Sequence, residues 1–119
     1  MNKFIPLVIH AFVLATLLAS SHGVLKWVSV QPHDDYFELL LAQWKYILLA
    51  LTIYGLVFFY YIFVLRSSPI SSLYPIYTGL SVLFVIVIGS VVFSEPITSF
   101  QVFGSALVLT GIVMMGWNS

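Results

Sequence analysis

Four hydroxyl-bearing side chains recur at spacings of three and four residues in one apolar stretch: Tyr74, Tyr77, Thr78 and Ser81. In a helix, residues three and four apart lie on the same face, so these hydroxyls would form one polar strip. Hydroxyl groups both donate and accept hydrogen bonds, which suits such a strip to line the path of a polar group. The alternative is that the strip holds two helices together by hydrogen bonds. The sequence leaves both interpretations open.

Pro75 lies within this strip, and Gly79 follows one turn later. A proline removes a backbone donor from a helix, and together with the glycine it can kink the helix, which favours a cavity wall. In the preceding apolar stretch, Tyr54 and Tyr61 are seven residues apart and would face the same cavity. Tyr60 and Tyr61 also fit the aromatic belt at a membrane surface, and we favour that interpretation for this pair.

His22 and Lys26 lie one helical turn apart at the end of the first apolar stretch. Histidine titrates near neutral pH and lysine carries a positive charge, so the two side chains could meet an anionic headgroup near the membrane surface. The simpler alternative is that His22 is only solvated or bonded to a neighbouring carbonyl. For the deeper His10 we expect a hydrogen bond between helices.

Other chemistry is not indicated. The sequence contains no nucleophile–His–acid set, HExxH motif or phosphate loop, so we expect no enzyme, cofactor or metal. Asp34 and Asp35 beside His33 could hold a surface cation, but a solvated turn explains them more simply. The formal net charge is zero, so there is no basic patch for nucleic acid, and no cysteine is present.

The composition predicts the elements that must position these groups. Hydrophobic residues make up 61% of the 119 residues and charged residues only 7%, against about 25% charged in average soluble domains. Four stretches reach the roughly 20 residues that a membrane span needs: 4–23, 46–65 (which could extend back to residue 36), 70–93 and 97–117. The charged residues all lie outside them: Lys3, Lys26, Asp34, Asp35, Glu38, Lys45, Arg66 and Glu95. The sequence therefore predicts one all-α domain over 1–119, a compact bundle of four transmembrane helices.

Helix ends and packing faces also show in the sequence. The runs 67–69 and 94–96 each place polar residues before a proline, as helix starts do, and we expect Glu95 to cap the last span. Ala11, Ala15 and Ala19 form a stripe where another helix can approach closely. Gly104 and Gly111 permit a close crossing within the chain or between chains.

The residues at the ends of the spans do not decide whether the first span is retained or which way the chain is oriented in the membrane. Residues 1–21 resemble a signal peptide, although we expect a retained span. With four spans, Lys3 and Arg66 share one side of the membrane, and Lys26 and Lys45 share the other. The positive-inside rule therefore selects no orientation. A weak bias, a partner or insertion in both orientations would each be compatible with this balance.

The pattern resembles the drug/metabolite transporter superfamily, and more narrowly its four-helix members. The similarity rests on Lys26 after the first span, Leu-Tyr-Pro-Ile-Tyr at 73–77, Phe-Ser-Glu-Pro at 93–96, and Gly104 with Gly111. These members include the small multidrug resistance exporters and the paired subunits that flip undecaprenyl-phosphate-aminoarabinose. The exporters carry a membrane-embedded acid eight residues before the lysine, where this chain has Leu18. The chain therefore looks more like the flippase branch, although its long first loop departs from both.

The resemblance implies a subunit of a bacterial-type inner-membrane transporter. The family's substrate-facing aromatic corresponds to Tyr74 or Tyr77, and its dimer glycines correspond to Gly104 and Gly111. The implied partners are a membrane lipid and a second small subunit, as a homodimer or a heterodimer with a related chain. The implied activity is movement of a polyprenyl-phosphate-linked sugar or related lipid between leaflets. An ion-coupled exporter of small hydrophobic cations and a non-transporting scaffold subunit are the alternatives.

Overall fold

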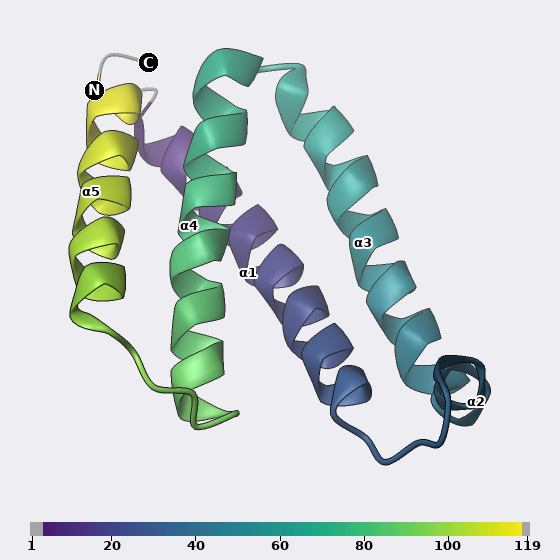
Figure 1. Cartoon of the computed structure of the whole chain (residues 1–119). Helices are drawn as coiled ribbons and strands as arrows, with labels where there is room; N and C mark the ends of the chain where they lie inside the picture. Colours follow the sequence, from purple (N-terminus) through teal and green to yellow (C-terminus); the bar gives the residue numbers. More distant parts are fainter. Residues whose placement is uncertain (1–3, 118–119) are drawn as a thin grey trace.

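The computed structural model describes residues 4–117, and these form five helices and no strand (Figure 1). The helices are α1 (Phe4–Ser29), α2 (Tyr36–Ala42), α3 (Trp44–Leu65), α4 (Ile70–Val91) and α5 (Ser99–Gly116). All except α2 are long and apolar enough to cross a membrane. The prediction of an all-α chain with four helices able to cross a membrane is therefore confirmed.

The end of the first span differs from the prediction. α1 continues past residue 23 to Ser29 and carries Lys26 in its last turn. A cation there complements the negative end of the helix dipole, and the long stem of lysine lets its charge reach the membrane surface. Trp27 packs against Tyr46 of α3 with ring centroids 4.6 Å apart, which ties this extra turn to the next span.

The extension of the second span back to residue 36 is wrong. Residues Tyr36–Ala42 form the separate helix α2, which Figure 1 shows end-on at the foot of α3. Asp35 caps α2 by accepting a hydrogen bond of 2.7 Å from the Glu38 amide. Gln43 then separates the two helices, because its backbone leaves the helical conformation and the chain turns into α3.

The predicted cap of the last span is also wrong. α5 begins at Ser99, where Thr98 and Gln101 form a reciprocal capping box. A threonine followed three residues later by glutamine satisfies two free amides at a helix start. Glu95 instead lies in the connection between α4 and α5, three residues before this cap.

The spans form a flat layer. Figure 1 shows α3 and α5 at opposite edges, with α1 crossing obliquely behind α4 and filling the space where α3 and α4 diverge. The molecule measures 52 × 36 × 17 Å. Two packed helices, with axes about 8–10 Å apart and Cα atoms about 2.3 Å from each axis, span roughly 13–15 Å between Cα atoms, so the layer is about two helices thick. The structure therefore shows the four long helices as a layer, and the compact dimeric bundle stays a prediction.

The core lies along α1. Ala11, Ala15 and Ala19 are at most 1% exposed, so the predicted small-residue stripe is the face on which other helices pack. α1 packs against both α3 and α4, and α4 also packs against α5. The larger buried side chains that complete this core are Leu7, Leu14, Val57, Val64, Leu73, Ile76, Tyr77 and Ile112. α4 runs as one continuous helix through Pro75.

Candidate functional site

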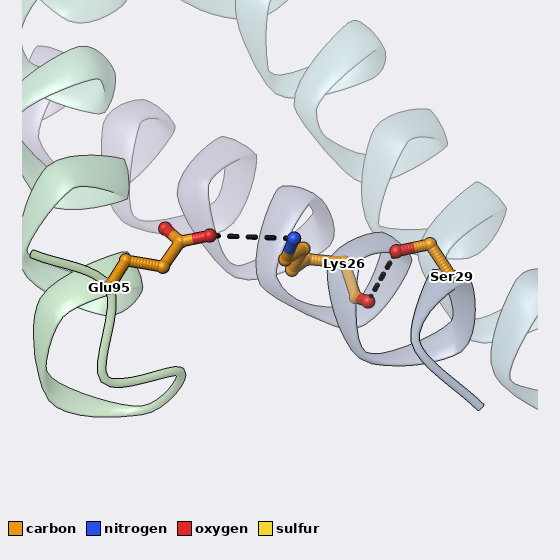
Figure 2. Close-up of polar contacts among 3 residues, drawn as sticks. All are labelled: Lys26, Ser29 and Glu95. Carbon is orange, nitrogen blue, oxygen red and sulfur yellow. Dashed lines mark hydrogen bonds and ion pairs between the residues drawn. The ribbon is translucent and has the colours of Figure 1, made fainter.

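An ion pair joins α1 to the connection that follows α4 (Figure 2). Lys26 Nζ lies 3.4 Å from Glu95 Oε2, and the two side chains are 46% and 51% exposed. The Lys26 carbonyl, on the same residue, accepts a 2.7 Å hydrogen bond from Ser29 Oγ. The pair therefore sits at the end of the spans where the α1–α3 and α4–α5 connections lie (Figure 1).

The backbone after α4 returns Glu95 toward α1. Ser94 has a backbone φ of 55°, in the left-handed region that residues other than glycine rarely adopt. The Glu95 amide then donates a 3.0 Å hydrogen bond to the Gly89 carbonyl, and so the connection folds over the end of α4. A Cβ on Gly89 would collide with the Glu95 carboxylate. The missing side chain at residue 89 therefore leaves the space that this carboxylate occupies.

A small cavity of about 130 Å³ surrounds the ion pair. Besides Lys26 and Glu95, the residues that line it include His22, Gly23, Gly89 and the apolar Val85 and Ile88 of α4. A lysine and a histidine beside one carboxylate can bind an anionic oxygen if the carboxylate moves aside.

A larger apolar groove of about 430 Å³ adjoins this cavity, because both include Ala19 and Ile88. Phe12 and Phe84 form part of its wall, in an edge-to-face contact with ring centroids 5.2 Å apart. The Thr16 and Ser20 hydroxyls in the lining donate to carbonyls of their own helix at 2.8 Å. The groove therefore presents an almost wholly apolar surface.

A second groove of about 280 Å³ brings two predicted site residues together. His22 and Ser81 both line it, and it shares His22 and Val85 with the charged cavity. Tyr54 Oη lies 3.4 Å from His22 Nδ1, so the predicted residue on α3 reaches the same histidine. Ser81 Oγ donates at 2.7 Å to the Thr78 carbonyl within its own helix.

The rest of the predicted hydroxyl strip lies elsewhere. Tyr74 and Tyr77 form an aromatic cluster with Tyr61, with ring centroids 5.3–6.4 Å apart. Within residues 4–117, the buried Tyr61 Oη has no hydrogen-bond partner. Thr78 Oγ1 donates at 2.7 Å to the Tyr74 carbonyl. The strip is therefore divided: Ser81 lies near His22, whereas Tyr74, Tyr77 and Thr78 lie outside the three cavities described above.

His10 and Tyr60 confirm one of the predictions. His10 Nδ1 and Tyr60 Oη share a hydrogen bond of 2.8 Å between α1 and α3. The deeper histidine thus has the interhelical bond that the sequence predicted for it.

Gly104 and Gly111 make no close helix contact with the described residues. A Cβ added to either glycine would meet no described atom within 4 Å. Exposed apolar side chains of α5, such as Phe103 and Leu107, accompany these glycines. Their face is open to lipid or to a second chain.

Two site residues were not found by sequence reasoning, namely Glu95 as the partner of Lys26 and Gly89 as the residue that makes room for it. The only signal was that both charges end spans on the same side of the membrane. In residues 4–117, no three His, Cys, Asp or Glu side chains are grouped as a metal site would require. Comparison with known protein families, with curated proteins and with solved structures finds no match to this chain.

Proposed function

We propose that this chain is one subunit of a dimeric transporter in a bacterial-type inner membrane, paired with itself or with a related small chain. Its substrate is an amphipathic lipid with an anionic headgroup, best fitted by a polyprenyl-phosphate-linked sugar or related lipid, which it moves between leaflets. The observation that carries this proposal is the charged cavity at Lys26 beside the apolar groove between α1 and α4.

The two parts of this site have different roles in the proposal. Lipid tails are as apolar as the groove, so leaving the bilayer for the groove gives little hydrophobic free energy. The groove therefore aligns the tail, and the headgroup provides selectivity. A phosphate oxygen bound to the Lys26 ammonium forms a charge-assisted hydrogen bond, which is stronger than a neutral one.

The open grooves support a dimer. The two grooves of about 430 and 280 Å³ are open at the surface of the described residues, so a second subunit would be needed to enclose a polar headgroup. Transporter sites commonly lie where two related halves meet. In the proposed dimer, the face at Gly104 and Gly111 contacts the second subunit. Of the four predicted hydroxyl residues, Ser81 lies beside the proposed path, in the groove that it shares with His22.

The first test is lipid flipping by the purified chain in vesicles. A short-chain polyprenyl phosphate with a fluorescent label is added, and dithionite quenching reports the fraction in the outer leaflet over time. We expect Lys26→Gln to slow flipping roughly tenfold, since it removes one charge-assisted hydrogen bond. Lys45→Gln is the matched control, because Lys45 lies over the Trp44 ring and outside the cavity.

For vesicles that hold the chain as a dimer, with itself or with the small chain that copurifies, flipping no faster than in protein-free vesicles would refute the proposal. Uptake of a cationic dye driven by a pH gradient, and lost in His22→Ala, would then identify an exporter. No flux of either kind, with one fixed partner in pull-down, would identify a scaffold subunit.

A further inference from the structure

Among the described residues that line the α1–α4 cavity, Lys26 is the only lysine or arginine, and it lies in the same lining as His22. Its ammonium group is already paired with the Glu95 carboxylate. An anion that binds Lys26 must therefore compete with the Glu95 carboxylate. We propose that Glu95 is a built-in competitor: its ion pair closes the polar end of the groove in the ligand-free chain, and a phosphate-bearing lipid displaces it. This inference rests on the proposed function and assigns a regulatory residue to the same site.

Three features hold the competitor in place. Ser94 adopts the left-handed backbone, the Glu95 amide donates to the Gly89 carbonyl at 3.0 Å, and Gly89 has no side chain to obstruct the carboxylate. The carboxylate is thus directed toward α1 by its own connection. The ring of Phe93 lines the same cavity and lies two residues before Glu95.

The exposure of the pair determines how firmly it closes the groove. Both side chains are about half exposed, so water screens their attraction and the ion pair is weak. A fully buried pair would be expensive to break once one partner is lost. This pair can therefore open when an anion of higher charge density reaches Lys26, and it closes again when that anion leaves.

The test measures binding of farnesyl phosphate and of farnesol to the full-length chain in detergent, by isothermal titration calorimetry. These probes share a tail and differ in the phosphate. Glu95→Gln keeps the size of the side chain and removes its charge. We expect it to raise the affinity for farnesyl phosphate about two- to fivefold, the range that an exposed ion pair supplies, and to leave farnesol unchanged.

Gly89→Ala tests the same idea without changing any charge. The added methyl group displaces the Glu95 carboxylate, so its affinity for farnesyl phosphate should rise as in Glu95→Gln. Gly55→Ala is the matched control, since a Cβ on Gly55 meets no described atom within 4 Å. In a Lys26→Gln background, Glu95→Gln should give no gain, because no cation remains for the anion to bind.

The outcomes separate the two proposals. If wild type prefers farnesyl phosphate and loses that preference in Lys26→Gln, but Glu95→Gln and Gly89→Ala bind like wild type, the competitor role is wrong and the headgroup site stands. If neither wild type nor Glu95→Gln distinguishes farnesyl phosphate from farnesol, the headgroup site itself is wrong. Unchanged helix content and elution volume show that each variant is folded.

Discussion

Ile112 on α5 lies directly against Gly79 on α4. A Cβ built on Gly79 would be 3.0 Å from Ile112 Cδ1 and 3.1 Å from Cγ1, closer than side chains normally pack. The glycine was expected to help Pro75 bend its helix. In the structure Gly79 has a packing role, since the missing side chain lets α5 approach α4.

A large side chain at this position should therefore weaken the docking of α5. We expect Gly79→Leu to destabilise the chain by about 1–3 kcal/mol, the usual cost of overpacking. SDS-induced unfolding in mixed micelles, followed by circular dichroism, measures the change. Gly55→Leu is the control, because residue 55 faces open space. Equal stabilities of the two variants would show that α5 does not depend on this contact.

The alanine stripe of α1 makes a second prediction. Ala15 is fully buried where α1 packs, so Ala15→Leu must push helices apart or force strained rotamers. We expect a loss of about 1–3 kcal/mol in the same unfolding assay. Ala106→Leu makes the same change on an exposed part of α5 and should be almost neutral. If Ala15→Leu left the free energy of unfolding unchanged, the packing of other helices against the alanine stripe of α1 would be looser than the structure shows.

The His10–Tyr60 bond gives a measurable coupling between α1 and α3. A double-mutant cycle of His10→Leu and Tyr60→Phe isolates the pair from the packing of each ring. Hydrogen bonds between membrane helices average about 0.6 kcal/mol in such cycles, and we expect a coupling energy of that order. Tyr54→Phe with His10→Leu should show no coupling, because Tyr54 contacts His22 instead.

Substitutions at Gly104 and Gly111 of α5 test association of two chains separately from the folding of one chain. We expect Gly104→Leu and Gly111→Leu together to leave the unfolding of one chain unchanged, since a Cβ at either position would meet no described atom within 4 Å. The same pair should abolish the dimer in native mass spectra recorded in mild detergent. A dimer that survives both substitutions would place the contact between subunits on another face.

The spans could be predicted from the sequence because they depend on local composition. A run of about 20 apolar residues is sufficient for a membrane helix, and the alanine spacing on α1 shows which face is packed. The residues at which the helices begin were harder to predict. Glu95-Pro96 fits a helix start, yet Thr98 with Gln101 supplies the better cap, and the helix begins there.

The site was only partly predictable, since it depends on contacts between helices. The sequence identified His22, Lys26 and Ser81, and these do line adjoining cavities. It could not pair Lys26 with Glu95, because nothing local links two charges so far apart in the chain. The sequence predicts the hydroxyl strip as one continuous face. In the structure, Tyr61 of α3 instead packs against Tyr74 and Tyr77, which form a separate aromatic cluster with it.

The thin layer has a consequence for what holds the chain together. In a membrane, a layer whose Cα atoms span only 17 Å across its thinnest direction would have lipid against both broad faces, so the bilayer would supply much of the surroundings that a thicker protein supplies for itself. Helices in such a layer are kept together by close contacts and by the lateral pressure of the acyl chains. Its stability should therefore follow bilayer thickness and lipid order closely, and micelles of short-chain detergent should loosen the outer helices α3 and α5 first.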